Sequence, residues 1–405
     1  MKNLSLIISL FFLTAFVNAQ ELQSLIEEAI QNNPEVQSFD IKYSIAEEKI
    51  KEANWLPNTE FSLGYFVSET ETRVGAQRAR IGVKQMLPWF GTLSARENYA
   101  SSMAEAEYIE VTIAKRKLGL SVAQSYYNLY ESSTKQLILE ENIQLLKTYE
   151  RLALTSVETG KASAVDVLRL QIRQNELKQQ KEILSEIFEA EKVAFNNLLN
   201  RDVNSEISSV VNLELPEENE VFDIDVLSLN PELLKYNKLY ESIVQSEMVN
   251  KRESLPTIGI GLDYLPVSER ADMVIADNGK DVIMPMVSVS IPLFNSKYTS
   301  ISKQNELRQK EIEFQKNQRY NILNTTFSKA LSQRNQAQIK YRTQSENLRQ
   351  ARDAEDILIK NYETGTINFN DLLDIQELQL KFQLNQIEST QSFYTQQSIL
   401  NYLIK

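Results

Sequence analysis

The chain contains neither cysteine nor histidine. Without cysteine it cannot form a disulfide, an iron–sulfur cluster or a thiolate zinc site, and no cysteine can carry a lipid at the mature N-terminus. Without histidine it lacks the side chain on which most general acid–base and transition-metal chemistry depends. No other polar constellation in the sequence has the make-up of a catalytic site. We therefore expect a protein that is not an enzyme and that binds no metal ion and no cofactor.

Long hydrophobic runs and an excess of basic residues are also absent. The 43 lysine and arginine residues are outnumbered by 55 aspartate and glutamate residues, so no nucleic-acid partner is expected. The one apolar run, at residues 4–17, follows Lys2 and ends at Val17-Asn18-Ala19, which is typical of a secretory signal. It is shorter than the roughly 20 residues of a transmembrane helix. Residues 1–19 are thus predicted to be a cleaved signal peptide, and the mature chain could enter a membrane only as a β-barrel.

Glycine is scarce, and two of the ten glycines mark an internal repeat. Gly160 and Gly365 are 205 positions apart, and each is followed six positions later by an aspartate, Asp166 or Asp371. Other landmarks recur in the same order: Asn33-Pro34 as Asn230-Pro231, Leu56-Pro57 as Leu255-Pro256, Pro88-Trp89-Phe90 as Pro292-Leu293-Phe294, and Asn196 as Asn401. The chain is a tandem duplication, with a first repeat at residues 20–215 and a second at 216–405.

Each repeat contains a stretch whose hydrophobic period is 2. In the first repeat Phe61, Leu63 and Tyr65 alternate with polar residues, and the pattern predicts β-hairpins at about 58–87 and 257–291. A sheet packed on a soluble core would show the same alternation. Here, however, the other face is glycine, serine and charge, as a water-filled lumen requires, and the strand length suits a tilted membrane crossing. Aromatic residues lie near the strand ends, where a membrane girdle belongs: Trp55, Tyr65, Trp89, Phe90, Tyr264 and Phe294.

Four strands cannot close a barrel by themselves. An open sheet edge in lipid would leave backbone N–H and C=O groups without partners. If the strands contact outer-membrane lipid, several copies of the chain must share one barrel.

The remaining parts of both repeats have a helical pattern. Residues 92–200 and 296–405 are predicted to form long helical hairpins, with sparse apolar residues at heptad spacing: Leu137, Leu145, Leu152, Val165, Ile172, Leu373, Leu380 and Ile387. Helices so polar are expected to form a one-layer wall rather than a thick core. At the turns, Gly160 and Gly365 would supply the left-handed end of one helix, and Ser163 and Asn368 would cap the next.

These features together resemble the TolC family of outer-membrane efflux proteins. The motifs that carry the resemblance are the Leu-Pro before the first strand of each repeat, the Pro-x-Phe after the second, and the Gly-x-x-Ser/Asn-x-x-Asp of the turns. The resemblance runs from about residue 20 to 405. It implies a mainly α fold with a small β part, in which a homotrimer closes a twelve-stranded outer-membrane barrel and its helices continue as a tube into the periplasm.

The same resemblance suggests roles for the hairpin turns. Turn residues would meet a periplasmic adaptor: Gly160, Lys161, Ala162, Ser163, Gly365, Thr366, Ile367 and Asn368. Asp371 and Asp374, on one face of a helix start, would form an acidic gate with Asp166 and Arg169 of the first turn. The simpler interpretation is that the glycines end helices and that the aspartates only favour the helix N-terminus through its dipole.

The sequence as a whole predicts a passive outer-membrane exit duct. It would receive substrates from a periplasmic adaptor and, indirectly, from an inner-membrane pump, in a tripartite efflux or type I secretion system. A soluble periplasmic coiled-coil adaptor is the alternative, because it would explain the helical hairpins. It would not explain four strands with aromatic ends.

Overall fold

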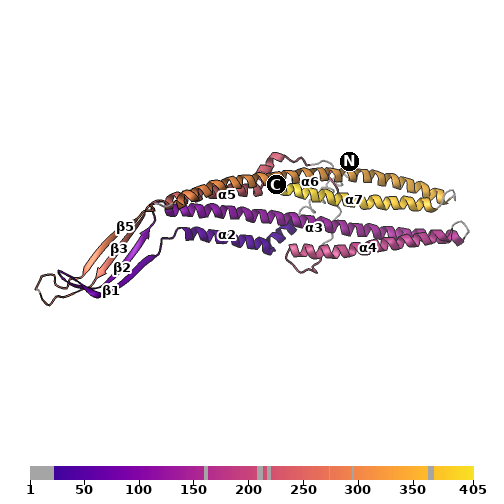
Figure 1. Cartoon of the computed structure of the whole chain (residues 1–405). Coiled ribbons are helices and arrows are strands. Elements are labelled where there is room, and N and C mark those ends of the chain that lie inside the picture. Colours follow the sequence, from indigo (N-terminus) through magenta and orange to yellow (C-terminus); the bar gives the residue numbers. More distant parts are fainter. Residues whose placement is uncertain are drawn as a thin grey trace, which may run out of the picture. The chain divides into compact units, whose positions relative to one another are not determined.

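The computed structural model describes residues 22–158, 163–207, 213–216, 220–272, 274–293, 296–363 and 369–405. The predicted signal peptide lies outside these residues. The helices are α2 (Pro34–Ala53), α3 (Thr92–Glu158), α4 (Ala164–Leu198), α5 (Pro231–Glu253), α6 (Lys297–Glu363) and α7 (Phe369–Ile404), with a short 3₁₀ helix η1 (Ile224–Leu229) (Figure 1). The strands are β1 (Thr59–Thr72), β2 (Gly75–Leu87), β3 (Thr257–Leu265), β4 (Val267–Ser268) and β5 (Val282–Ser290). None of the described helices is apolar over a length that could cross a membrane.

The chain divides into two compact units. The sheet unit comprises residues 39–111 and 231–319, and the helical unit comprises the described parts of 1–38, 112–230 and 320–405. Each unit takes equivalent segments from both repeats, because each repeat crosses from the helical unit to the sheet unit and back.

The sheet unit contains an antiparallel sheet of order β1-β2-β3-β5, with β4 paired to β2. Phe61 lies opposite Val83, and Val83 lies opposite Leu262, so these residues share one face. That face is apolar and bare, since Phe61 and Leu63 are 82% and 84% exposed. The opposite face carries Ser62, Gly82, Asp263 and Met284 in one register row. The predicted alternation is therefore present, and among the residues that the structure describes no core covers its apolar side.

The helices of the sheet unit form a row in the same order as the strands. α2 meets α3 through the rings of Tyr43 and Tyr108, whose centroids are 5.5 Å apart. α3 meets α5 through Lys238 and Glu105, at 2.8 Å. α5 meets α6 through the Asn305 amide, which donates to Glu247 at 3.0 Å. The order α2-α3-α5-α6 matches β1-β2-β3-β5, so each strand continues into the helix at the same place in the row.

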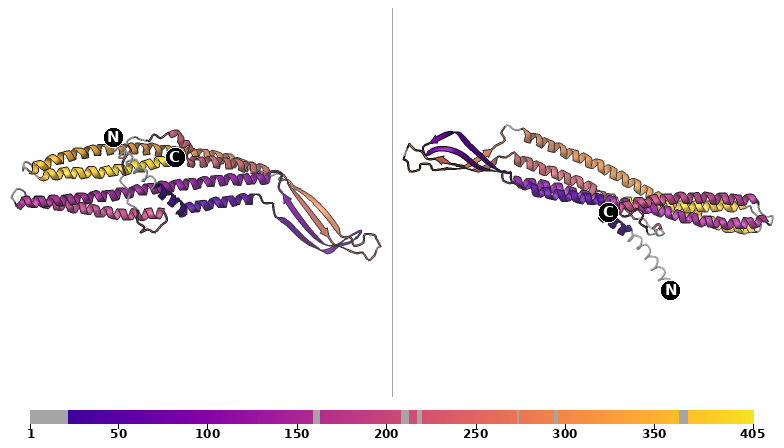
Figure 2. Two further views of the ribbon diagram at one scale, coloured as in Figure 1. Left: turned by 180° about the vertical axis from the view of Figure 1, so that it is seen from behind. Right: turned by 90° about the horizontal axis from the view of Figure 1, so that it is seen from below.

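In the helical unit, α3 lies antiparallel beside α4, and α6 beside α7 (Figure 2). The two hairpins share one apolar cluster, which packs between neighbouring helices. Of the residues at heptad spacing, Leu137, Leu152, Val165 and Ile172 are more than half exposed, whereas Leu380 and Ile387 are buried. Leu145 and Leu373 pack against the cluster. The buried cluster is formed by Leu139, Ile143, Leu146, Tyr149, Ala153, Val167, Leu170, Leu177, Leu372 and Leu380.

The duplication is visible in equivalent hydrogen bonds. The Asn33 amide donates to the Leu198 carbonyl at 3.1 Å, and the Asn230 amide donates to the Leu403 carbonyl at 2.9 Å. Both asparagines directly precede a helix that begins with proline. The bond ties the asparagine to the C-terminal end of α4 in the first repeat and of α7 in the second. The Asn-Pro landmark of the sequence is thus a repeated structural joint.

Candidate channel tip

The first predicted turn ends in a capping box. The Ser163 hydroxyl accepts the Val165 N–H at 3.2 Å, and the Asp166 carboxylate accepts the Ser163 N–H at 3.2 Å. These bonds satisfy N–H groups that the first turn of a helix leaves unpaired. Asp166 therefore has a structural partner inside its own turn.

Most other predicted turn residues lie outside the described residues. They are Gly160, Lys161, Ala162, Gly365, Thr366, Ile367 and Asn368. Their assignment to adaptor docking remains a prediction.

The two aspartates of the second turn are both exposed. Asp371 is in the first turn of α7, and Asp374 follows one helical turn later. Asp374 lines a hollow of about 330 Å³ together with Arg169 and Arg173 of α4. The structure thus brings Arg169 and Asp374 to one site within a single chain.

Arg169 makes its hydrogen bond to another residue of α7. Its guanidinium donates to the Asn370 amide oxygen. One turn further along α4, Arg173 lies 3.3 Å from the carboxylate of Glu377, and it also pairs with Glu176 at 2.8 Å. Arg169 and Arg173 therefore form a polar seam with Asn370 and Glu377, where the first hairpin meets the second.

Each hairpin is also fastened by one glutamate and two glutamines. In the first, Glu150 of α3 accepts from Gln171 at 2.7 Å and from Gln174 at 2.8 Å. In the second, Glu355 of α6 accepts from Gln376 and from Gln379, the latter at 2.7 Å. All three residues recur at a spacing of 205 positions. We call these two sets the Glu150 clamp and the Glu355 clamp.

The Glu355 clamp has a member from the other repeat. The Tyr149 hydroxyl of α3 donates to the Glu355 carboxylate at 2.8 Å and also lies 3.3 Å from the Gln376 amide. Burial, and then the hydrogen bond to the carboxylate, raise the pKa of Tyr149 well above its ordinary value. The phenol therefore stays protonated and remains a hydrogen-bond donor. In the Glu150 clamp, the hydrogen bonds from Gln171 and Gln174 lower the pKa of Glu150.

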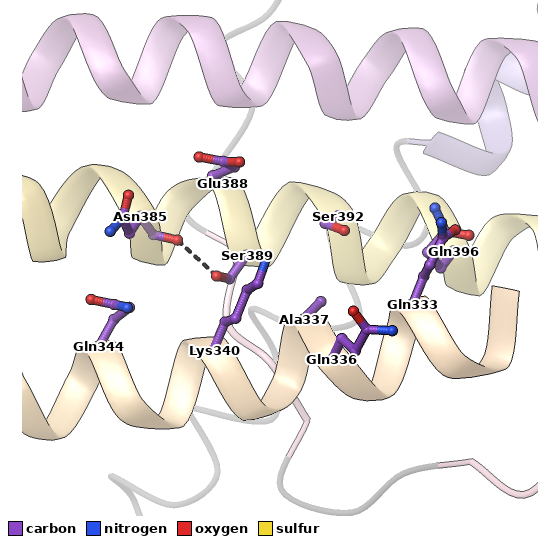
Figure 3. A pocket seen from close by; sticks show the side chains of 10 residues that line it. All are labelled: Gln333, Gln336, Ala337, Lys340, Gln344, Asn385, Glu388, Ser389, Ser392 and Gln396. Atoms are coloured by element: carbon purple, nitrogen blue, oxygen red, sulfur yellow. Dashed lines mark hydrogen bonds between the residues drawn. The ribbon is translucent and has the colours of Figure 1, made fainter. Parts of the chain in front are cut away.

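A second hollow, of about 450 Å³, lies between α6 and α7 (Figure 3). Its lining is almost wholly polar, with Lys340 of α6 reaching toward Ser389 of α7 and amides around them. The Ser389 hydroxyl donates to the Asn385 carbonyl at 2.7 Å.

The predicted girdle residues lie at two levels of the sheet. Trp55 precedes β1, and Trp89 and Phe90 follow β2, so these three mark the end of the sheet next to the helices. Tyr65 lies in the middle of β1, and Tyr264 lies near the end of β3. Trp55, Tyr65 and Phe90 are more than 70% exposed. Phe294 lies outside the described residues.

A family comparison explains this architecture. The sequence model described as outer membrane efflux protein matches residues 25–186. This stretch of the chain is therefore similar to the outer membrane efflux protein family. The predicted resemblance is thereby confirmed, and the outer-membrane localisation expected from the sequence is that of the family. No curated protein matches the chain with significance.

Solved structures extend the likeness to nearly the whole chain. VceC from Vibrio cholerae is 16% identical with a TM-score of 0.74, over 95% of this chain and 96% of that one. CmeC from Campylobacter jejuni is 14% identical with a TM-score of 0.73, over 95% and 85%. The open state of MtrE from Neisseria gonorrhoeae is 15% identical with a TM-score of 0.71, over 95% and 88%. At identities this low the likeness shows the fold alone. Because it covers 95% of this chain, it includes the second repeat as well as the first.

Sequence reasoning missed the seam and both clamps. Arg173, Glu377, Tyr149 and the clamp glutamines were not singled out, because they are common residues on polar helices. A signal was nevertheless present: Glu150, Gln171 and Gln174 recur together at the repeat spacing, as Gly160 and Asp166 do.

Proposed function

We propose that this protein is the passive exit duct of a tripartite efflux or type I secretion system. It would conduct substrates from a periplasmic adaptor, and indirectly from an inner-membrane pump, to the exterior. It would carry out no chemistry on them. The single observation that carries the proposal is a row of four strand–helix segments that is open on both sides.

Both ends of that row need a partner. β1 and β5 are the edge strands, and an unpaired edge cannot remain in lipid. The helices that continue them carry exposed apolar side chains, Ile41 and Ile45 on α2 and Leu307 and Phe314 on α6. Joining β5 and α6 of one copy to β1 and α2 of the next satisfies both needs. Three copies arranged in this way would close a twelve-stranded barrel and a tube of helices.

The bare apolar face of the sheet would then contact lipid, and the row with Ser62, Gly82 and Asp263 would line the lumen. Trp55, Tyr65, Trp89, Phe90 and Tyr264, with Phe294, would form the girdle at the two membrane interfaces.

At the other end, the turns would meet the adaptor. Six carboxylates, from Asp371 and Asp374 of three copies, would surround one axis and favour cations. Two such charges roughly 6 Å apart repel by about 3 kcal/mol at an effective dielectric near 20. A closed ring therefore needs cations or donors nearby, and Arg169 beside Asp374 is a suitable donor.

Fractionation and electrical recording together test the proposal. We expect the protein in the outer membrane as a trimer that survives mild detergent and dissociates on heating, and discrete conductance steps after reconstitution into planar bilayers. Recovery as a soluble periplasmic monomer would instead support the coiled-coil adaptor. A trimer without conductance, under conditions that open related channels, would contradict the duct.

A further inference from the structure

The hollow between α6 and α7 lies within the second hairpin and is lined by polar side chains (Figure 3). Its volume of about 450 Å³ is within the range of small-molecule sites, roughly 300–1,000 Å³. Two lining residues, Ala337 and Ser389, are only 3% and 4% exposed, so the hollow reaches the interior of the hairpin. Of the ten lining residues, Ala337 alone is apolar. The hollow therefore suits a polar ligand rather than an apolar one.

The first hairpin has bulky apolar residues at the equivalent positions. The residues that lie 205 positions before Gln344, Ser389 and Ser392 are Leu139, Leu184 and Ile187. Leu139 belongs to the buried apolar cluster, and Leu184 packs against it. In the second hairpin these three aliphatic side chains are replaced by two small ones and one amide. The hollow is thus specific to the second repeat and is not a general property of the hairpin.

One wall of the hollow carries a lysine that has lost its partner. Lys340 of α6 is the equivalent of Lys135, which pairs with Glu131 of the same helix at 2.6 Å in the first repeat. In the second repeat the position of Glu131 is taken by the neutral Gln336. Within the part of the chain that the structure describes, Lys340 has neither an ion pair nor a hydrogen bond. The cation has been kept while its internal carboxylate has been removed.

The other wall carries a carboxylate, and hydrogen-bond acceptors lie between the two. Glu388 of α7 stands where the first repeat has Ile183, and none of the described residues pairs with it. The side-chain oxygen of Gln344 is buried and accepts no hydrogen bond from the described residues. The Ser389 hydroxyl donates within its own helix, so its oxygen can still accept. Buried polar atoms usually have partners, and here a bound molecule can supply them.

We infer that this hollow binds a short zwitterionic peptide. The peptide carboxylate would contact Lys340, its ammonium group would contact Glu388, and its N–H groups would donate to the oxygens of Gln344 and Ser389. A neutral sugar would leave both charges without a counter-charge, and a simple ion would use only one of them. Bonds to charged groups are stronger than neutral hydrogen bonds, so both ends of the peptide contribute to recognition. The inference does not depend on the proposed duct.

Titration calorimetry of the purified protein with triglycine tests the site. We expect saturable binding at one site per chain. Lys340→Gln and Glu388→Gln should each weaken it about tenfold or more, because each removes a charge-assisted bond. The matched control is Lys135→Gln, at the equivalent position of the first hairpin, and it should bind as the wild type does.

Two further measurements assign the contacts. Triglycine amide, which lacks the carboxylate, should bind the wild type weakly, and Lys340→Gln should weaken its binding no further. Ser389→Leu/Ser392→Ile places the residues of the first repeat in the hollow and should abolish binding of triglycine. Circular dichroism shows whether this variant is folded. Lys340→Gln and Glu388→Gln change exposed side chains and therefore test the site even when the double variant does not fold.

Three results would overturn the inference. The first is the absence of saturable triglycine binding to the wild type. The second is binding that survives in a folded Ser389→Leu/Ser392→Ile variant, because the peptide would then lie elsewhere. The third is equal affinity for triglycine and its amide, since Lys340 would then contact no carboxylate. Conductance is measured separately, so a channel that conducts without binding triglycine would disprove the site and leave the duct intact.

Discussion

The two helical hairpins of the chain differ in an instructive way. Inside each hairpin the fastening is the same, since Glu150 with Gln171 and Gln174 recurs as Glu355 with Gln376 and Gln379. At the seam between the hairpins the residues differ, because Arg169 and Arg173 contact α7 and stand where the second repeat has Asp374 and Leu378. A duplicated segment keeps the clamp that fastens its own two helices. It diverges where its two copies meet different neighbours.

The largest expected effect tests whether the strands of both repeats share one environment. Leu63→Arg in the first repeat and Ile260→Arg in the second should each abolish trimer assembly, because a charge on the lipid face costs about 2–4 kcal/mol near the bilayer midplane. Ser62→Arg and Ser288→Arg, on the opposite face, should assemble normally. The measurement is the yield of heat-dissociable trimer in outer membranes. Equal yields in all four variants would contradict the assignment of the faces.

A smaller effect is expected when the glutamate of either clamp is removed, and it should be larger for the Glu355 clamp than for the Glu150 clamp. Glu355→Leu removes an acceptor that three buried donors share, Tyr149, Gln376 and Gln379. Gln379 keeps the Ala351 carbonyl at 3.2 Å and Gln376 keeps the Tyr149 hydroxyl at 3.3 Å. Loss of an acceptor for a buried donor costs about 1–3 kcal/mol. Glu150→Leu removes the acceptor of only one buried donor, Gln174, so this variant should lose less stability. Urea midpoints of the purified variants, read by circular dichroism, should fall more for Glu355→Leu, and the reverse order would show that the clamps are not what distinguishes the hairpins.

Substituting the aspartate of the first turn should affect stability, whereas substituting those of the second turn should affect ion selectivity. Asp166→Ala removes one half of a capping box and should cost about 1 kcal/mol of stability, with unchanged cation preference. Asp371→Ala/Asp374→Ala should reduce the cation preference of single channels and weaken block by divalent ions added on the periplasmic side. If the double variant conducts as the wild type does, these aspartates serve only their helix start.

The smallest effect is a dependence on pH. Because hydrogen bonds lower the pKa of Glu150 in the folded protein, its contribution to stability is present above its unfolded pKa of about 4.3 and is lost as the pH falls through the folded value. The wild type should therefore lose more stability than Glu150→Gln on acidification through this range. Parallel loss in both proteins would show that the lowered pKa of Glu150 does not contribute to acid sensitivity.

The sequence predicted those parts of the fold in which hydrophobic residues recur with a regular period or in which the backbone requires a particular residue type. Alternation at Phe61, Leu63 and Tyr65 located a strand, and the Asn-Pro and Gly-x-x-Ser/Asn landmarks located joints and turns. The buried face was predicted in α7, where Leu380 and Ile387 are buried, but not in α3. α3 carries leucine on two faces: Leu137 and Leu152 are exposed, while Leu139 and Leu146 are buried. Only the packing of two hairpins decides between these faces. The clamps and the seam escaped for a related reason, since glutamine and glutamate on a polar helix give no signal until the partner helix is placed.

Tyr149 gives the tip a mechanical property. Its hydroxyl, from the first repeat, shares the Glu355 carboxylate with two amides of α7, so that one pair of oxygen atoms joins α3, α6 and α7. A twist of either hairpin about its own axis would therefore strain several of these bonds at once. The carboxylate couples the torsion of three helices through one pair of oxygen atoms.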